Sequence, residues 1–216
     1  MTDQSLRITE VFYSLQGEAL AAGLPTVFIR LTGCPLRCVY CDSEYAFFGG
    51  ERMSFDELLA QVATYNPRYV CVTGGEPLAQ PNCLPLLRLL CDRGYQVSLE
   101  TSGALDISGV DERVSVVMDL KTPGSGELSK NRLDNIPLLK PKDQIKFVIT
   151  DYADFQWASF TTAQYQLADM VGAVWFSPSF GQVNPVHLAE WILRDRLPVR
   201  FQLQLHKQLW GEVPGV

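Results

Sequence analysis

Three cysteines, Cys34, Cys38 and Cys41, lie on one short stretch of the chain with three and then two residues between them. Cysteine thiolates are the usual protein ligands of iron–sulfur clusters. Three of them can hold three corners of a cubane cluster and leave the fourth iron without a protein ligand. Gly33 and Pro35 supply turns that let one loop wrap such a cluster. The spacing therefore predicts a [4Fe–4S] cluster with an open iron that can bind a small molecule.

A zinc site is the alternative, because two cysteines separated by two residues also form half of a zinc site. Such a site needs further ligands. The remaining cysteines are Cys71, Cys83 and Cys91, and the histidines are His187 and His206. None of them forms a second closely spaced pair, so the spacing favours the cluster. The three remaining cysteines lie in apolar patterns and are predicted to be small core residues, and His187 is predicted to be structural.

Composition predicts one sizeable α/β domain over residues 1–216, because 47% of the side chains are apolar and no run is long enough to cross a bilayer. No secretory signal is expected, and six cysteines then indicate reduced thiols or metal ligands in the cytoplasm. The net charge of -6 gives no overall attraction to nucleic acid or to an anionic membrane, so neither is expected as a partner.

Apolar runs rich in β-branched and aromatic residues alternate with helical patterns along the chain. This alternation is typical of βα units around a parallel sheet. Strands are predicted at 26–31, 69–73, 96–100, 114–119, 144–149, 174–177 and 199–204. Helices are predicted at 54–65, 83–92, 153–167 and 185–195, and an irregular connection at 121–143. The helix at Ser54 begins with a capping box that includes Glu57.

Polar segments follow the predicted strands at their carboxyl ends. They are residues 74–77 (Gly-Gly-Glu-Pro), 100–103 (Glu-Thr-Ser-Gly), 119–121 (Asp-Leu-Lys) and 177–179 (Ser-Pro-Ser). In parallel α/β barrels the loops at this end build the active site. The two glycines of the first segment let backbone groups approach a ligand closely, although an ordinary strand-to-helix turn uses the same residues. We expect the four segments to converge on one site.

Together, the cysteine spacing and the segment 74–76 resemble the radical S-adenosylmethionine superfamily. In that superfamily the open iron chelates the methionine part of S-adenosylmethionine, and a segment of the 74–76 type holds its amino group. An aromatic residue before the last cysteine, here Tyr40, fits the same pattern. The resemblance implies contacts to this cofactor from Tyr40, Gly74, Gly75, Glu76, Gly103, Asp119, Leu120, Lys121, Ser177, Pro178 and Ser179.

Within the superfamily the chain is similar to the 7-carboxy-7-deazaguanine synthase family, which belongs to queuosine and deazapurine biosynthesis. The matching segments run in the same order over nearly the whole length: 14–18, 28–30, the cysteine loop, 74–77, 100–103 and 204–207. The resemblance implies a modified and truncated single-domain (β/α) partial barrel, a homodimer and a requirement for Mg²⁺. It also implies a carbon–nitrogen lyase that contracts 6-carboxy-5,6,7,8-tetrahydropterin with loss of ammonia, after hydrogen abstraction from C6, with a flavodoxin or ferredoxin-type electron donor.

By the same resemblance, the pterin is bound by Leu15, Gln16, Gly17, Glu18, Arg30, Thr101 and His206. A flat ligand rich in donors and acceptors needs matched polar groups in fixed positions. Arg30 suits a substrate carboxylate because its planar guanidinium donates two parallel hydrogen bonds, and the alternative is a pair with a nearby acidic residue. Base rates alone favour a structural role for a lone histidine, and it is the family segment that favours a site role for His206.

Two positions depart from the family pattern. Ala19 stands where the family usually has glycine, and we expect the loop to keep its fold. Ser43 stands where the family has a threonine whose hydroxyl binds Mg²⁺, and serine keeps that oxygen. Some relatives end soon after the segment at 204–207, with the terminal carboxylate near the substrate, whereas this chain continues to Val216.

Two other functions remain open at this stage. A glycyl-radical-enzyme activase shares the cysteine loop and segment 74–77, but it acts on a protein partner, and segments 16–18 and 204–206 argue against it. A non-enzymatic metal-binding protein has no use for Arg30, for Thr101 or for the polar segments after the strands.

Replacing Cys34, Cys38 or Cys41 by Ala is expected to abolish the cluster, because each thiolate holds a different corner. Protein reconstituted without oxygen should be brown and contain about four irons per chain, and each of these variants should lose both properties. The matched control is Ala substitution of the other cysteines, which should keep the colour and the iron. Stoichiometric zinc without iron in the wild-type protein would contradict the cluster assignment.

Overall fold

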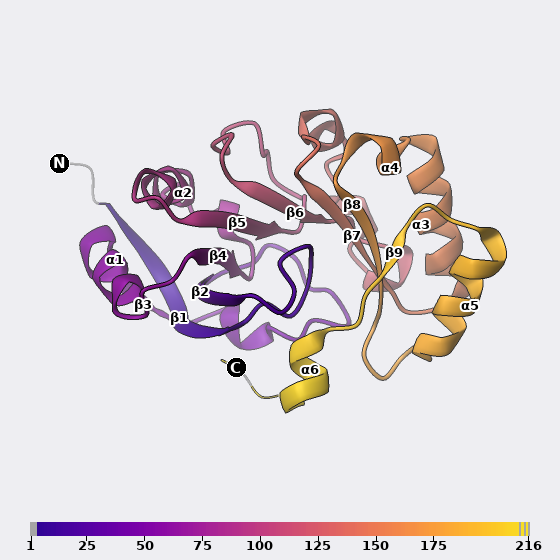
Figure 1. Cartoon of the computed structure of the whole chain (residues 1–216), viewed down its shortest axis with the longest axis horizontal. Coiled ribbons are helices and arrows are strands. Elements are labelled where there is room, and N and C mark those ends of the chain that lie inside the picture. Colours follow the sequence, from indigo (N-terminus) through magenta and orange to yellow (C-terminus); the bar gives the residue numbers. More distant parts are fainter. Residues whose placement is uncertain (1–3, 212, 214, 216) are drawn as a thin grey trace.

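The computed structural model describes residues 4–211, 213 and 215. Within them, nine strands form one sheet in the order β3-β1-β2-β4-β5-β6-β7-β8-β9 (Figure 1). The strands are β1 (Ser5–Leu15), β2 (Pro25–Leu31), β3 (Glu51–Ser54), β4 (Tyr69–Gly74), β5 (Gln96–Thr101), β6 (Ser115–Asp119), β7 (Gln144–Ile149), β8 (Ala173–Pro178) and β9 (Arg200–Phe201). From β2 to β9 all neighbours are parallel, and β1 and β3 add antiparallel at one edge. The sheet is open, which confirms the predicted partial barrel.

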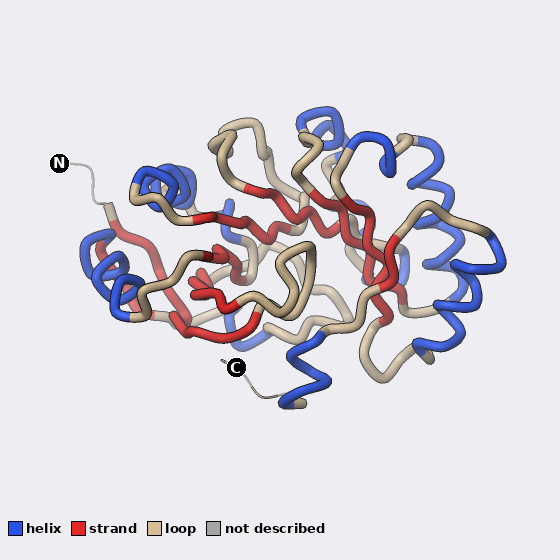
Figure 2. The backbone as a smooth tube through the Cα atoms, in the orientation of Figure 1, coloured by secondary structure: helices blue, strands red, loops and turns tan. Residues whose placement is uncertain are grey.

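Helices cover the outer side of the curved sheet (Figures 1 and 2). They are α1 (Phe55–Thr64), α2 (Cys83–Asp92), α3 (Tyr152–Gln164), α4 (Leu167–Met170) and α5 (Pro185–Asp195). The terminal helix α6 (Leu205–Trp210) does not belong to this layer and contacts the turn after β1. Between β6 and β7 the chain forms only 3-10 turns, so the predicted irregular connection is confirmed and the barrel is truncated there. Among the described residues, no helix combines the length and apolar character needed to cross a bilayer.

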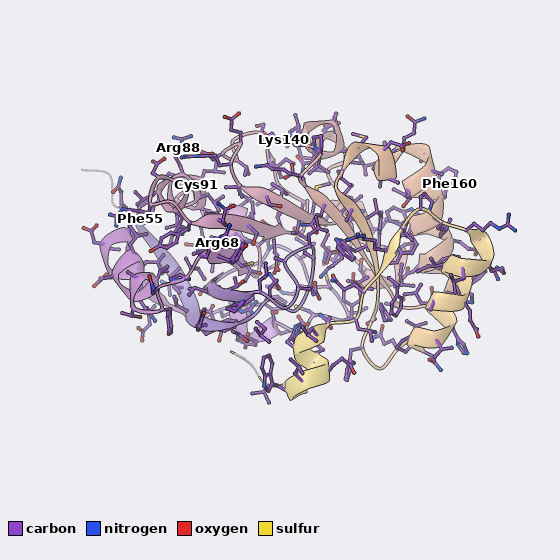
Figure 3. The ribbon with its side chains drawn as sticks, in the orientation of Figure 1. Phe55, Arg68, Arg88, Cys91, Lys140 and Phe160 are labelled. Carbon is purple, nitrogen blue, oxygen red and sulfur yellow. The ribbon has the colours of Figure 1, made fainter. Side chains whose placement is uncertain are left out.

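Two apolar clusters hold the helices on the sheet. The first packs α1 and α2 against β1, β2, β4 and β5, and it includes the predicted core residue Cys83. Phe55 and the predicted core residue Cys91 belong to the same cluster (Figure 3). The second packs α3, α4 and α5 against β6, β7 and β8. Cys71 is also fully buried. The predicted capping box of α1 is present, since Ser54 accepts a hydrogen bond from the Glu57 backbone and the Glu57 side chain accepts one from Ser54.

The structure adds two strands and corrects two predicted elements. Strands β1 and β3 were not predicted, because charged residues such as Arg7 and Glu10 interrupt the apolar pattern of β1. The predicted strand at 199–204 is reduced to β9, and α6 follows it. The predicted helix at 153–167 ends at Gln164 because Gln166 has a left-handed conformation, and α4 begins after it.

The turn between β1 and β2 carries three of the predicted pterin-binding residues, Gln16, Gly17 and Glu18. Its ends are joined by a hydrogen bond from the Gln16 N–H to the Leu24 carbonyl at 2.9 Å. Ala19 lies in this turn with φ of 64°, a left-handed conformation that glycine adopts without strain. The Gln202 side chain accepts a hydrogen bond from the Ala19 N–H at 2.7 Å and donates one to the Ala19 carbonyl at 3.3 Å. The loop therefore forms with alanine in it, and Gln202 holds the strained residue from the other end of the chain.

Replacing Ala19 by Gly is expected to leave the unfolding free energy unchanged or to raise it by up to about 1.6 kcal/mol. Relief of the left-handed strain contributes roughly 1–2 kcal/mol, and the greater freedom of glycine in the unfolded chain offsets roughly 0.4–1 kcal/mol. Urea unfolding measures the difference. Ala22→Gly in the same turn is the control, because Ala22 has no positive φ and should only lose stability. An equal loss in both variants would contradict the strain at Ala19.

Candidate active site

A cavity of about 530 Å³ lies at the carboxyl ends of the parallel strands. Its volume falls within the range of small-molecule sites. The sequence-predicted residues that line it are Leu15, Gln16, Gly17, Glu18, Arg30, Cys34, Cys38, Tyr40, Cys41, Ser43, Gly74, Gly75, Thr101, Asp119, Lys121, Ser177, Pro178, Ser179 and His206. Glu76, Gly103 and Leu120 do not line it, nor does His187. The polar segments thus converge on one cavity, as expected.

The three predicted cluster cysteines lie on the loop after β2 and all line the cavity. Arg37 shapes this loop, because its guanidinium donates to the Cys34 carbonyl at 2.8 Å and lies over the Phe47 ring at 4.2 Å. Burial raises the pKa of Cys38 to about 11, so cluster assembly must displace its proton. Among the described residues no three His, Cys, Asp or Glu side chains converge as ligands of a single metal ion. A cubane places its thiolates on different irons and needs no such convergence.

Gly75 packs against the cysteine loop. A Cβ atom at this position would lie 2.7 Å from the Cβ of Cys34 and would also meet the Gly33 carbonyl oxygen. The Glu76 N–H donates to that carbonyl at 2.8 Å. The glycine is therefore required for the approach of two protein loops, whatever ligand its backbone also meets.

The Glu76 side chain is fully buried and joins two loops. Its carboxylate accepts hydrogen bonds from the Ser102 N–H at 2.7 Å, the Thr101 hydroxyl at 2.9 Å and the Leu78 N–H at 3.0 Å. Because the carboxylate faces these donors and not the cavity, any contact of Glu76 with a cofactor has to come from its backbone. Thr101 lines the cavity but its hydroxyl is committed to Glu76.

Gly103 and Leu120 are placed behind the cavity wall. The Gly103 carbonyl accepts from the Asn135 side chain at 3.0 Å. Leu120 is fully buried, and its N–H donates to the Lys146 carbonyl at 2.9 Å. The cavity lining gives no support to the cofactor contacts predicted for these two residues.

Arg30 meets the acidic partner that the sequence left open as an alternative. Its Nε donates to Glu10 Oε1 at 2.6 Å, and the Tyr45 hydroxyl donates to the same oxygen at 2.8 Å. Among the described residues, neither Nη nitrogen of Arg30 has a hydrogen-bond partner. The end of the guanidinium that can grip a carboxylate therefore remains available in the cavity wall.

The C-terminal helix α6 closes one side of the cavity. The Leu205 N–H donates to the Gly17 carbonyl at 3.0 Å, and His206 lies so close that a side chain at position 17 would collide with its imidazole. Burial lowers the pKa of His206, which keeps the imidazole neutral near pH 7. Lys207 pairs with Asp42 at 3.0 Å. The described residues beyond α6 that line the cavity are Gly211, Val213 and Gly215, so the extension lies along the site.

Three buried polar atoms in the cavity wall have no hydrogen-bond partner among the described residues: the Tyr40 hydroxyl, Asp119 Oδ1 and the Ser177 hydroxyl. Such atoms are costly to bury unsatisfied. All three belong to segments predicted to bind S-adenosylmethionine. Their chemistry fits a cofactor with an amino group, hydroxyls and a carboxylate, and the three thiols on the adjoining loop fit the cluster.

Sequence reasoning missed several charged residues of the site, above all Lys146 on β7. Its Nζ lies 2.5 Å from Glu18 Oε2 and 3.8 Å from Asp119 Oδ2. Burial alone lowers the pKa of Lys146, but the charges of Glu18 and Asp119 outweigh it and raise the pKa above its usual value. A lysine inside a mostly apolar strand of a parallel sheet was the signal that could have revealed it. Glu10 was missed because it lies on β1, a strand that the sequence pattern did not predict.

Comparisons with known proteins agree with this geometry. The model of the Radical SAM superfamily matches residues 28–123. A protein from Koribacter versatilis named 7-carboxy-7-deazaguanine synthase is 44% identical, with 98% of this chain and all of that protein aligned. A protein of the same name from Chlorobaculum tepidum is 44% identical over 97% of this chain and 96% of its own. The crystal structure of QueE from Escherichia coli matches with a TM-score of 0.74 over 94% of this chain and 95% of that one, at 24% identity, which bears on the fold.

The sequence similarity to these two proteins extends over nearly the whole length of both chains. The chain therefore belongs to the 7-carboxy-7-deazaguanine synthase family of radical S-adenosylmethionine enzymes.

Proposed function

We propose that this chain is a radical S-adenosylmethionine carbon–nitrogen lyase that converts 6-carboxy-5,6,7,8-tetrahydropterin to 7-carboxy-7-deazaguanine and ammonia, in queuosine and deazapurine biosynthesis. The observation that carries the proposal is that one cavity is lined by the cysteine loop, by all the predicted pterin-binding residues and by all the predicted cofactor-binding residues except Glu76, Gly103 and Leu120. The names of relatives 44% identical over nearly the whole chain support the same reaction.

The residues divide the work between binding and orientation. When bound, the cluster and S-adenosylmethionine supply the electron and the radical chemistry. Cys34, Cys38 and Cys41 hold the cluster, and the buried polar atoms of Asp119 and Ser177 receive the cofactor.

On the opposite side, the pterin meets the turn after β1 and the guanidinium of Arg30. Gln16 is already oriented there, because its Nε2 donates to Glu100 Oε1 at 3.2 Å. Holding both ligands in fixed positions, away from bulk water, is the contribution of the protein to rate.

Mg²⁺ completes the proposed site. Ser43 lines the cavity, and its hydroxyl donates to Asp42 Oδ1 at 3.0 Å. The hydroxyl oxygen is therefore positioned near the cysteine loop to accept a metal ion. Mg²⁺ prefers oxygen ligands in octahedral geometry and keeps several waters. One protein hydroxyl, the substrate carboxylate and water form a suitable set. We further propose a flavodoxin or ferredoxin-type electron donor, a homodimer and a cytoplasmic location.

The two alternatives use less of the site. An activase of glycyl-radical enzymes must admit a protein segment, whereas α6, Gly211, Val213 and Gly215 line one side of this cavity. A metal-binding protein without catalysis leaves the unpartnered atoms of Tyr40, Asp119 and Ser177 unexplained.

The reaction itself is tested by incubating the reconstituted protein without oxygen with the carboxypterin, S-adenosylmethionine, Mg²⁺ and a reductant. Mass spectrometry is expected to find a product lighter than the substrate by one ammonia. Cys38→Ala, which should lack the cluster, is the control and should form none. Cleavage of S-adenosylmethionine with the pterin left unchanged in the wild-type protein would refute the proposed substrate.

Ser43→Ala is expected to lower turnover and to weaken its dependence on added Mg²⁺, because the variant lacks the proposed ligand oxygen. The cluster spectrum and the binding of S-adenosylmethionine should stay unchanged. Ser43→Thr keeps the hydroxyl and should behave like the wild type. Titration of activity with Mg²⁺ measures the effect, and an unaltered Mg²⁺ response in Ser43→Ala would remove Ser43 from the site.

Arg30→Lys is expected to weaken carboxypterin binding by roughly 1–3 kcal/mol, the range for losing a charge-assisted hydrogen bond. Lysine keeps the charge, but it cannot bind Glu10 through one nitrogen and a carboxylate through two others. Calorimetric titration with the pterin measures the loss, and slow cleavage of S-adenosylmethionine without substrate serves as the internal control. Wild-type pterin affinity in the variant would show that Arg30 serves only its pair with Glu10.

A further inference from the structure

We propose that Lys146 is a positioning residue that couples the binding of the pterin to the binding of S-adenosylmethionine, by serving as a shared counter-charge for Glu18 and Asp119. The inference rests on the proposed function, because it takes Glu18 as part of the pterin side and Asp119 as part of the cofactor side. Nothing in the sequence pattern assigned a role to Lys146.

The position of Lys146 in the sheet explains why it reaches both carboxylates. On β7 it pairs in register with Asp119 of β6, so the two side chains leave neighbouring strands side by side. Glu18 comes from the turn after β1, 128 residues earlier in the chain. The Lys146 side chain is 16% exposed and lines the cavity between the two acids. Lys146 thus joins a residue of one ligand side to a residue of the other.

The remaining contacts of the two acids make Lys146 different from its neighbour Lys121. Glu18 uses its other oxygen, Oε1, to accept from Gln204 Nε2 at 2.7 Å. Asp119 Oδ2 is shared by Lys121 at 3.0 Å and Lys146 at 3.8 Å, while Asp119 Oδ1 has no hydrogen-bond partner among the described residues. Lys121 therefore supports only the cofactor side, whereas Lys146 supports both.

A shared counter-charge gives a physical route for coupling. An ammonium group carries three hydrogen-bond donors and one charge, and burial makes each pairing strong. A ligand that fixes Asp119 orders Lys146, and an ordered Lys146 holds Glu18 in the position that the second ligand needs. By thermodynamic reciprocity, each ligand then raises the affinity of the protein for the other ligand by the same factor. Couplings of this kind commonly amount to roughly 5–150-fold in affinity.

The test measures the affinity of S-adenosylmethionine with and without saturating carboxypterin, without oxygen and without reductant, so that neither ligand reacts. The cluster-loaded wild type is compared with Lys146→Met and with Lys121→Met. In the wild-type protein, we expect saturating pterin to raise the affinity for S-adenosylmethionine at least fivefold. In Lys146→Met this ratio should fall to about one. In Lys121→Met the affinity for S-adenosylmethionine alone should fall, but pterin should still raise that affinity by the wild-type factor.

A second measurement adds reductant and determines the amount of 5′-deoxyadenosine formed per molecule of product. This amount should rise in Lys146→Met, because cleavage of S-adenosylmethionine no longer depends on a correctly positioned pterin. Lys146→Met leaves two buried carboxylates without their common partner, and this variant could fail to fold for that reason. A double variant, Glu18→Gln with Lys146→Met, removes one of these charges and is measured in its place if the single variant does not fold. The double variant should also show a ratio of about one.

The inference would be overturned if folded Lys146→Met, or the double variant, kept the wild-type ratio of S-adenosylmethionine affinities with and without pterin. It would also be overturned if the two ligands bound independently in the wild-type protein. A wild type that binds neither ligand would instead refute the proposed function. Loss of the ratio in both lysine variants would also overturn the specific role of Lys146, because general loss of positive charge would then explain it.

Discussion

The buried carboxylate of Glu76 is the contact on which the geometry of the site depends. It joins the loop after β4 to the loop after β5 through the Thr101 hydroxyl and the Ser102 backbone. One residue earlier, Gly75 lies against the cysteine loop with no room for a side chain. Three loops from three strands are thereby fixed to one another. A buried carboxylate requires several donors, and these donors are what hold the loops in place.

This arrangement leaves the rest of the cavity wall prepared for ligands. The protein satisfies Glu76 internally, but it leaves the Tyr40 hydroxyl, Asp119 Oδ1 and the Ser177 hydroxyl without partners. Unsatisfied polar groups destabilise a folded chain, so stability here is lower than it would be with an apolar wall. Preorganised polar groups at fixed positions are what selective binding and orientation require.

The sequence was sufficient for the parts of the molecule that rest on local patterns. The spacing of Cys34, Cys38 and Cys41 and the parallel strands from β2 to β8 are of this kind. Prediction failed where a partner distant in the chain decides the structure. The β1 strand needs its pairing with β2 and β3, and the guanidinium of Arg30 is oriented by Glu10 on that strand.

The same limit applied to single side chains within predicted motifs. Glu76 was assigned to the cofactor because its motif was recognised, yet its carboxylate binds Thr101 and Ser102. Lys146 was overlooked because its partners, Glu18 and Asp119, come from other strands and turns. A motif identifies which residues belong to a site, but their contacts depend on the register of strands that the motif does not contain.

The central claim is that one cavity holds S-adenosylmethionine and the pterin together, with the C6 position of the pterin at the reacting end of the cofactor. The most direct measurement is turnover of carboxypterin labelled with deuterium at C6, followed by mass spectrometry of the recovered S-adenosylmethionine and 5′-deoxyadenosine. Deuterium is expected in both, because the hydrogen taken from C6 passes to the 5′-deoxyadenosyl group and the proposed reaction then regenerates S-adenosylmethionine. Product formation with no deuterium in either would contradict it.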